Sequence, residues 1–302
     1  MTRVLVTGAS GFIGRGTLQP LLDAGAEVHA LSSRPAASDA TPGVRWHQHD
    51  LLDPASAPAI AALEATHLLH LAWTTQPGRF WTSPDNLDWL EASLRLTRAF
   101  TRGGGRRMVM AGTCAEYEWS ADTHCVERAT PTRPATLYGT AKDALHHTVA
   151  TFAAQESLSM AWGRVFFAYG PHEQRGRLAS SVAESLLRGE VAQCSLGEQV
   201  RDFLYAPELA EAFAALLLSD VEGPVNMASG LPLPVRDLIT AIARAAGRPE
   251  LVALGARPTS PDEPARLTAD VSRLRDEVGW APHLSLDEAA ERTVAWWRRQ
   301  LG

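Results

Sequence analysis

A short strand pattern, a glycine-rich turn, a helical pattern and a second strand pattern follow one another in the first 31 residues. Val4–Val6 is an apolar run, and Thr7–Gly14 reads TGASGFIG. Leucines at helical spacing follow in Leu18–Leu22, and Val28–Leu31 is the second apolar run. A helix that joins two neighbouring parallel strands makes a unit of about this length. The segment therefore predicts a βαβ unit and, with it, a parallel sheet.

The alternation of strand and helix patterns continues for about half of the chain. A third strand candidate is Val44–Trp46, and the later apolar runs are His67–Ala72, Met108–Ala111 and Trp162–Phe167. The helical stretches between them are Ala55–Glu64, Asp85–Thr101 and Leu137–Glu156. Strands that alternate with helices predict an α/β fold with a doubly wound parallel sheet of the Rossmann type.

The pattern changes after Gly170 and Pro171, where shorter elements are separated by Pro, Gly and Arg. We assign residues 1–168 to a dinucleotide-binding domain. We expect 201–228 to return to its sheet through strand-like runs at Arg201–Tyr205 and Val225–Met227, with a helix at Pro207–Leu218 between them. Residues 169–200 and 229–302 should form mainly a smaller C-terminal, substrate-binding lobe, which ends in an amphipathic helix at Leu286–Arg299.

Composition excludes several classes of partner. The net charge is −6 and the basic residues are scattered, so neither nucleic acid nor an anionic membrane is expected as a partner. The apolar runs are far shorter than the ~18 residues of a membrane helix. The N-terminal segment reaches Thr7 and Gly8 too early for a secretion signal, so we expect a cytoplasmic protein.

The sequence offers no recognisable metal motif. The cysteines (Cys114, Cys125 and Cys194) lack the spacing of a metal site, and no HExxH motif occurs. His146 and His147 are adjacent, so they point in different directions on a helix. We therefore predict no metal site.

The glycine-rich turn predicts a dinucleotide site. Gly8, Gly11 and Gly14 allow a tight turn and a close approach of the backbone to a pyrophosphate at the N-terminus of a helix. The residues predicted to bind the cofactor here are Gly8, Ser10, Gly11, Phe12, Ile13 and Gly14. A purely structural turn is the alternative.

The residues at the end of the second strand favour NADP(H) as the cofactor. NAD(H) is the alternative. NAD sites place an acidic residue about 20 residues after the glycines, whereas this chain has Ser32, Ser33 and Arg34. A hydroxyl pair and a guanidinium can bind a 2′-phosphate; alternatively, Arg34 is a solvated loop residue. Asp50 and Leu51 either cradle the adenine or belong to a helix cap before Asp53.

A tyrosine and a lysine four residues apart predict an acid–base pair. Tyr138 and Lys142 share one face of a helix, and a nearby ammonium lowers the pKa of a phenol. Lys142 is the single lysine among 28 basic residues, which indicates a role that guanidinium does not fill. Thr113 ends a strand at the carboxyl edge of the sheet, where its hydroxyl can reach a substrate carbonyl.

Taken together, the motifs resemble those of the extended short-chain dehydrogenase/reductase family, in the branch that acts on nucleotide-activated sugars. They are Thr7–Gly14, His70–Ala72, Ala111–Thr113, Tyr138–Lys142, Arg164–Pro171, Arg201–Tyr205, Asn226–Gly230 and Gly279–Pro282. The resemblance covers nearly the whole chain.

The resemblance implies roles for individual residues. Thr113, Tyr138 and Lys142 form the implied catalytic set, with Tyr138 as general acid or base and Lys142 also on the nicotinamide ribose. Further implied contacts are Leu71 and Ala72 to the cofactor, Thr74 and Phe167 to the sugar, and Arg201 to the diphosphate or nucleoside of the substrate.

Departures from the family pattern narrow the reaction. Relatives that remove water carry acidic residues where this chain has Cys114 and Ala115, and Glu116 is shifted by one position, to the opposite face of a strand. A 4,6-dehydratase is therefore disfavoured. Many relatives carry Asn at Phe167, which alters the sugar contact. Ser32, in place of an acidic residue, suits an enzyme that exchanges NADPH at each turnover.

These features predict an NADPH-dependent reductase of a nucleotide-activated 4-keto-6-deoxy sugar, with Tyr138 as proton donor. The alternative is a nucleotide-sugar epimerase with tightly bound NAD(P). A non-catalytic dinucleotide-binding sensor would not need the Tyr138–Lys142 pair.

The helices at 85–101 and 137–156 predict a homodimer. Both carry apolar residues beyond the single stripe that would cover the sheet, and the resemblance implies pairing of these helices about a two-fold axis. Alternatively, the extra apolar residues only thicken the core.

Overall fold

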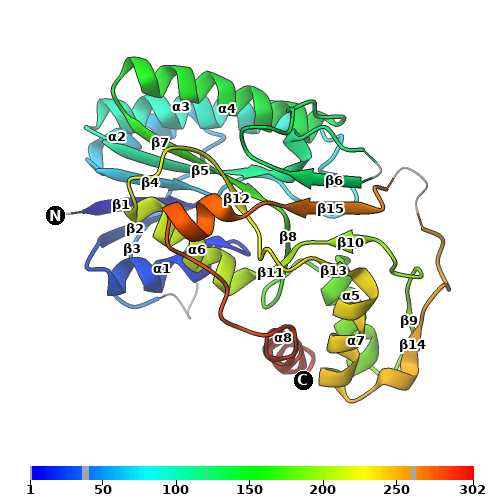
Figure 1. Cartoon of the computed structure of the whole chain (residues 1–302). Coiled ribbons are helices and arrows are strands. Elements are labelled where there is room, and N and C mark those ends of the chain that lie inside the picture. Colours follow the sequence, from blue (N-terminus) through cyan, green and yellow to red (C-terminus); the bar gives the residue numbers. More distant parts are fainter. Residues whose placement is uncertain (1, 36–40, 121, 260–262) are drawn as a thin grey trace.

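Seven parallel strands form the central sheet in the computed structural model, which describes residues 2–35, 41–120, 122–259 and 263–302 (Figure 1). Their order is β12-β7-β5-β4-β1-β2-β3. The strands are β1 (Arg3–Thr7), β2 (Glu27–Ser32), β3 (Arg45–Gln48), β4 (His67–His70), β5 (Arg107–Thr113), β7 (Ser159–Val165) and β12 (Gly223–Met227). The chain runs outward from β1 to one edge and then crosses to the other side of β1. This order confirms the predicted doubly wound sheet.

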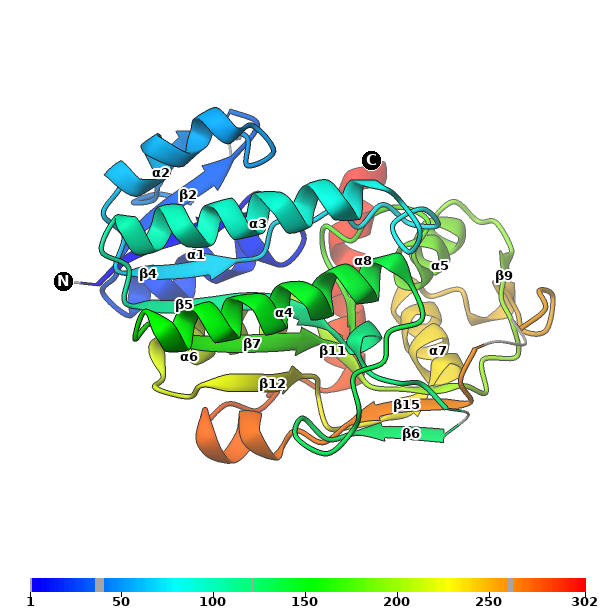
Figure 2. The same cartoon turned by 90° about the horizontal axis from the view of Figure 1, so that it is seen from above.

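Helices cover both faces of this sheet (Figure 2). On one face lie α2 (Ala57–Ala62), α3 (Asp85–Arg102) and α4 (Leu137–Gln155), and on the other lie α1 (Gly14–Asp23) and α6 (Ala206–Leu218). Leu96, Leu145 and Trp162 belong to the core under α3 and α4, whereas Leu18 and Phe213 belong to the core under α1 and α6. Burial on both faces explains why the central strands have apolar middles, Val4–Val6 in β1 and Met108–Met110 in β5.

The strand order changes direction beside β1, whose neighbours are β2 and β4. The carboxyl ends of parallel strands at such a point leave a crevice in which α/β proteins bind ligands. A buried hydrogen bond of 2.6 Å joins Thr7 Oγ1 and His70 Nδ1 at the ends of β1 and β4, and His70 Nε2 reaches Ser93 Oγ of α3 at 2.8 Å. These bonds fix the floor of the crevice.

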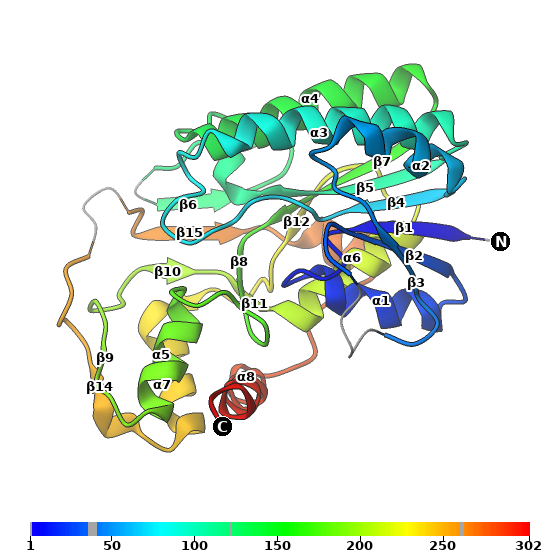
Figure 3. The ribbon, with the colours of Figure 1, turned by 180° about the vertical axis from the view of Figure 1, so that it is seen from behind.

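A smaller lobe lies at the carboxyl side of the sheet (Figure 3). Its helices are α5 (Leu178–Leu187), α7 (Val235–Ala246) and α8 (Leu286–Leu301). Its four-stranded sheet has the order β13 (Leu233–Pro234), β10 (Val200–Arg201), β15 (Arg266–Ala269) and β6 (Asp122–Cys125). Two strand pairs complete it: β11 (Phe203–Tyr205) with β8 (Phe167–Tyr169), and β14 (Val252–Ala253) with β9 (Ala192–Gln193). Short helical turns occupy Pro54–Ser56, Cys114–Glu116, Pro249–Leu251 and Arg273–Glu277.

The segment 201–228, which we expect to return to the main sheet, divides between that sheet and the lobe. Val225–Met227 belongs to β12, which pairs with β7, and α6 packs on the same sheet. The run Arg201–Tyr205, by contrast, divides into β10 and β11, which pair with lobe strands. Asp202 lies between them with no exposure, and its carboxylate accepts hydrogen bonds from Ser229 N at 2.7 Å and Ser229 Oγ at 2.6 Å. These hydrogen bonds fix Asp202 between the two strands, so the strand-like run is interrupted and its two halves pair within the lobe.

Across the described ranges, the structure has no helix whose length and hydropathy would allow it to cross a bilayer.

Candidate active site

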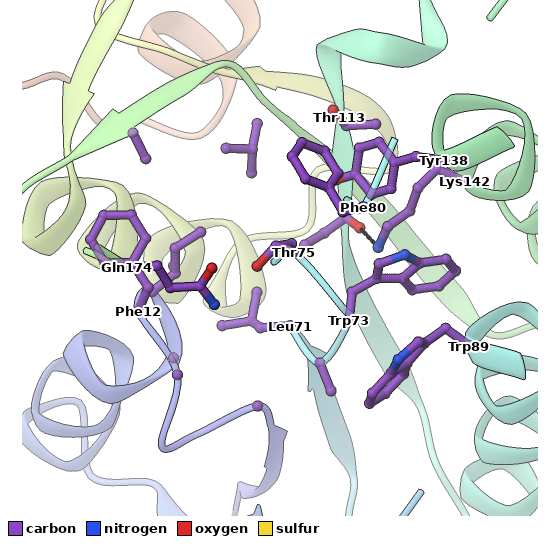
Figure 4. Close-up of a pocket in the computed structure, with 18 of the residues that line it drawn as sticks. Phe12, Leu71, Trp73, Thr75, Phe80, Trp89, Thr113, Tyr138, Lys142 and Gln174 are labelled. Carbon is purple, nitrogen blue, oxygen red and sulfur yellow. Dashed lines mark hydrogen bonds between the residues drawn. The ribbon is translucent and has the colours of Figure 1, made fainter. Parts of the chain in front are cut away.

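A cavity of about 960 Å³ opens between the carboxyl ends of the central strands and the lobe (Figure 4). Nearly all predicted site residues line it: Gly8, Ser10, Gly11, Phe12, Ile13, Gly14, Ser33, Arg34, Asp50, Leu51, Leu71, Ala72, Thr113, Tyr138, Lys142, Phe167 and Arg201. Thr74 is the exception. It lines a neighbouring cavity of about 440 Å³ with Gln76, Arg79 and Asp85.

The glycine turn leaves no room for side chains. Gly8 has a φ of +68°, in the left-handed region, and a Cβ added there would lie 2.8 Å from Ala72 N. A Cβ on Gly14 would lie 2.1 Å from Gly8 O. The backbone is therefore bare at the N-terminus of α1, which fits the pyrophosphate of a dinucleotide.

Beyond the turn, a hydroxyl-rich rim follows β2. Ser32 is buried, and its Oγ accepts a hydrogen bond of 3.1 Å from Arg34 N and lies 3.4 Å from Ser10 Oγ. Ser33 and Arg34 are exposed at the cavity wall. The segment Ser32–Arg34 contains neither Asp nor Glu. A phosphate bound there would contact the Arg34 guanidinium without repulsion from a carboxylate of this segment.

Asp50 lies in the cavity wall, and the helix cap belongs to Asp53. The Asp53 side chain accepts from Ala55 N at 2.9 Å at the start of the helical turn Pro54–Ser56. Asp50 Oδ1 accepts from Leu52 N at 3.0 Å, which holds its carboxylate at the cavity side of the loop.

Tyr138 lies in the first turn of α4, where the hydroxyl of Thr136 caps the helix by accepting from Gly139 N at 3.1 Å. The backbone N–H of Tyr138 donates to Trp81 O at 3.1 Å. The rings of Phe80 and Trp81 meet the Tyr138 ring edge-on, at centroid distances of 5.0 and 5.8 Å. Tyr138 is 8% exposed. The loop before α3 therefore covers the tyrosine with aromatic side chains.

The pKa of Tyr138 differs from the sequence prediction. Burial raises this pKa, while the Thr113 side chain and, more weakly, the Arg177 guanidinium act in the opposite direction. Among the groups with the largest influence, the cation is Arg177 and not Lys142. The prediction that the ammonium lowers the phenol pKa is therefore wrong for this structure, because desolvation outweighs the charges. Tyr138 is held as a neutral phenol.

Lys142 points toward the cavity beside an indole ring (Figure 4). Its Nζ donates to Ala111 O at 2.9 Å and lies 3.8 Å from the centroid of Trp73. Burial lowers the pKa of Lys142 to about 7. Trp73 is fixed in turn, since its Nε1 donates to Asn86 Oδ1 at 2.9 Å. The ammonium thus sits in a narrow, partly apolar slot.

Glu116 faces away from the cavity, as predicted, but for a different reason. It belongs to the helical turn after β5 rather than to the strand. It is fully buried and accepts hydrogen bonds from Thr113 N at 2.8 Å and from Arg164 Nε at 2.7 Å. Cys114 does line the cavity, as a buried thiol whose pKa is raised by burial. The end of β5 thus presents a thiol, not a carboxylate, beside Thr113.

Sequence reasoning missed several lining residues, chiefly Trp73, Phe80, Trp81, Trp119, Arg177 and Glu263. A signal was available, because Trp73 directly follows the motif His70–Ala72 and Phe80 and Trp81 fall in a loop rather than in a core pattern. For Arg177 and Glu263 no local pattern indicated the site.

Two arginines reach the cavity from the lobe side. Arg177, the N-cap of α5, donates from Nη2 to Thr75 O at 3.1 Å. Arg201 is 3% exposed, and its Nη2 lies 2.8 Å from Glu263 Oε1. Its guanidinium also lies 5.4 Å from the Phe167 ring. Guanidinium groups so placed can bind a diphosphate.

The chain is similar in sequence and in fold to known proteins. Residues 4–228 match the model of a family described as NAD dependent epimerase/dehydratase. The chain is 30% identical to dTDP-6-deoxy-L-talose 4-dehydrogenase (NAD(P)(+)) of Kitasatospora kifunensis, over 95% of this chain and 93% of that protein. It is 28% identical to UDP-glucose 4-epimerase of Streptomyces lividans, over 93% and 91%. The crystal structure of Thermus thermophilus UDP-glucose 4-epimerase with NAD has a TM-score of 0.85 at 28% identity, over 98% and 99%.

We expect Lys142→Met to stabilise the fold at pH 7. The folded-state pKa of about 7 lies below the ordinary 10.5, so the unfolded chain holds the proton more tightly and wild-type stability rises from pH 7 to pH 10.5. The variant lacks this dependence. Its gain at pH 7 should be about 2–4 kcal/mol, since one pKa unit is about 1.4 kcal/mol and the lost hydrogen bond and cation–π contact offset part of it.

Urea unfolding at pH 7 and pH 10 measures the effect. Arg133→Met is the control, because the Arg133 side chain is exposed in a surface pair with Glu118 and should change stability by less than ~1 kcal/mol at both pH values. A variant less stable than wild type at pH 7, or a gain unchanged at pH 10, would contradict the assignment of Lys142 as a destabilised cation.

Proposed function

Since this chain belongs to the NAD-dependent epimerase/dehydratase family, we propose that it is an NADPH-dependent reductase of a nucleotide-activated 4-keto-6-deoxy sugar. It is an enzyme of the extended short-chain dehydrogenase/reductase type. A relative 30% identical is named as a 4-dehydrogenase of a dTDP-linked 6-deoxy sugar. Written in reverse, oxidation at C4 is reduction of a 4-keto group, so the proposed reaction is the same chemistry in the opposite direction.

The aromatic wall around Tyr138 is the observation that carries the proposal. Phe80 and Trp81 meet the phenol ring edge-on. The ring centroid of Trp119 lies 6.2 Å from that of Trp81, and Phe167 lines the same cavity. The Arg177 guanidinium lies 5.7 Å from the centroid of the Phe80 ring. An apolar surface binds a C6 methyl group well, and its rings satisfy a hydroxymethyl group poorly. This part of the cavity therefore suits a 6-deoxy sugar.

The residues of the glycine turn and of the cavity fit a bound dinucleotide. Gly8 to Gly14 would hold the pyrophosphate on the bare backbone, and Lys142 would hold the nicotinamide ribose. Leu71 and Ala72 would line the cofactor channel, with Asp50 and Leu51 near the adenine. When bound, the reduced cofactor supplies the hydride that the C4 carbonyl carbon accepts.

Tyr138 would act as the general acid. Because burial raises its pKa, the phenol carries the proton that the carbonyl oxygen must receive during reduction. Thr113, at the end of β5, would donate a hydrogen bond to the same oxygen. The ammonium of Lys142 would stabilise the negative charge that develops there.

The two lobe arginines would hold the nucleotide diphosphate. Arg201 and Arg177 both line the cavity, and bidentate guanidinium–phosphate contacts are strong and directional. Phe167 would contact the sugar. Thr74 would reach it only if the two cavities join when the substrate binds, because it now lines the smaller one.

The direct test is NADPH consumption with a panel of dTDP-, CDP-, GDP- and UDP-linked 4-keto-6-deoxy sugars. We expect one of them to be reduced, and we expect Tyr138→Phe to lower kcat by about 10²–10⁴-fold, the usual contribution of a general acid. Dinucleotide affinity should stay within about threefold, because the change removes a proton donor and little packing.

Tyr169→Phe is the matched control, because Tyr169 is equally buried but does not line the described cavity; its activity should be near wild type. Activity of Tyr138→Phe within a few-fold of wild type would remove Tyr138 from the mechanism. No reduction of any 4-keto sugar would overturn the reductase proposal.

A nucleotide-sugar epimerase is the second candidate, favoured by the 28% identity to epimerases of Streptomyces lividans and Thermus thermophilus. An epimerase that borrows and returns a hydride retains its cofactor, whereas a reductase exchanges it. Tightly bound NAD(H) in the purified protein, with no net NADPH consumption, would decide for the epimerase.

Cofactor preference should follow Ser33 and Arg34. We expect the enzyme to use NADPH better than NADH, and Arg34→Ala to raise KM for NADPH about tenfold or more with little effect on NADH, because the guanidinium would contact only the 2′-phosphate. Arg79→Ala is the control, since Arg79 lines the smaller cavity. A wild-type preference for NADH would contradict the assignment.

We also propose a two-fold homodimer through α3 and α4. On α3, Leu87 is 56% exposed, whereas Leu90 and Leu94 are half-buried and pack against the core; together they leave an apolar strip that is partly open to solvent. Light scattering at micromolar concentration should give about twice the 32.6 kDa chain mass. Leu87→Glu should shift the mass toward the monomer, whereas Leu231→Glu, at an exposed leucine of the lobe, should not. A wild-type monomer would exclude the dimer.

A further inference from the structure

Three potential metal ligands gather on α4, outside the cavity already described. Asp143, His146 and His147 each place one ligand atom within 4.8 Å of the others. Adjacent helical residues point about 100° apart, which is why the sequence predicted no metal constellation at the two histidines. On the helix, however, Asp143 is three and four positions before them. Its direction lies between theirs, so the aspartate closes the group.

Two of the three side chains have a buried atom without a hydrogen bond. These atoms are Asp143 Oδ1, which forms a 3.4 Å ion pair with His147 Nε2 but no hydrogen bond, and His146 Nδ1. His146 is 8% exposed, and its ring stacks on Trp162 at a centroid distance of 4.9 Å, which fixes its plane. Most buried polar atoms are hydrogen-bonded, because an unpaired one is costly. Among the described residues, seven buried side-chain atoms lack a hydrogen bond, and two of the seven belong to this cluster.

The third ligand supplies a distance that can be compared with metal geometry. His147 Nε2 lies 3.4 Å from Asp143 Oδ1. Two donors bound to one tetrahedral ion at ~2.0–2.1 Å are separated by about 3.3–3.4 Å. The aspartate and the exposed imidazole therefore already stand at the separation that a shared ion requires.

We propose that Asp143, His146 and His147 form a binding site for a divalent transition-metal ion of the Zn²⁺ type. Two imidazoles and one carboxylate are ligands that Zn²⁺ prefers to Mg²⁺ or Ca²⁺, which take oxygen donors. In the single chain the His147 side chain is 66% exposed, so the site there opens to solvent. Water completes the coordination on that side.

The position of the site gives it a structural role. Asp143 follows Lys142 directly on α4, and Trp162, on which His146 stacks, donates from Nε1 to both carboxylate oxygens of Glu116 at 3.0 Å. A bound ion would hold three side chains along one turn of the helix that carries Tyr138 and Lys142. It would thereby stabilise α4 without touching the reacting atoms.

Zn²⁺ titration of the tag-free full chain, followed by isothermal calorimetry, tests the site. We expect one Zn²⁺ per chain with a Kd in the micromolar range or below, and a rise in Tm with Zn²⁺. His147→Ala and Asp143→Asn should each weaken binding at least ~10-fold, as loss of even an outer-shell partner can do. Both should abolish the rise in Tm. His147 is exposed, so its variant is expected to fold.

His124→Ala is the matched control. His124 is an exposed histidine that bonds Thr268 in the lobe, so Zn²⁺ binding should equal that of wild type. The proposed dimer also uses α4. Zn²⁺ binding is therefore counted per chain, at a protein concentration at which light scattering has given the mass of the assembly. No binding up to ~100 μM Zn²⁺ would overturn the proposal, as would binding that His147→Ala and Asp143→Asn leave unchanged.

Discussion

The carboxylate of Glu116 holds together the part of the fold on which the site depends. It has no exposure, and it joins the end of β5 to two residues of β7 by accepting from Thr113 N, Trp162 Nε1 and Arg164 Nε. Burying a carboxylate raises its pKa and is tolerated only when partners satisfy the charge. Removing one member of such a buried pair costs about 3–5 kcal/mol, since the other charge stays behind. The position of Thr113 at the cavity is thus coupled to the integrity of the core.

The cavity itself works against stability. Burial lowers the pKa of Lys142 and raises that of Tyr138, so both groups are kept in their neutral forms more than water would allow. Residues placed in this way are expected where a site needs groups poised to move protons. The indole of Trp73 and the carbonyl of Ala111 offset part of the penalty for Lys142. Near neutral pH the cost in stability comes from Lys142, because the phenol of Tyr138 is protonated in the folded and the unfolded chain alike. Under the proposed function, this phenol would supply the proton.

Local patterns were sufficient to predict the strands of the central sheet, the helices that cover it and the glycine turn, since each follows from residues close in sequence. Helices α5 and α7 of the lobe were not predicted. The tight turn at Gly8 needs a positive φ, and the cap at Thr136 needs only its own helix. What failed depended on distant partners. The break at Asp202 requires Ser229, and the pKa of Tyr138 is governed by burial under a loop some 60 residues earlier, around Phe80. No spacing rule contains such contacts.

Arg201 provides a buried cation for an anionic group of the proposed substrate. Its guanidinium is buried, and the carboxylate of Glu263, which is 38% exposed, neutralises it at 2.8 Å. Under the proposed function, a nucleotide diphosphate would exchange with Glu263 for this cation. The exchange is favourable because a diphosphate carries more charge than one carboxylate, and the partly exposed Glu263 returns to water at little cost. A neutral sugar or a free nucleoside gains nothing from it. Under the proposed function, the ion pair would therefore satisfy the buried cation until a substrate binds and would favour substrates that carry a diphosphate.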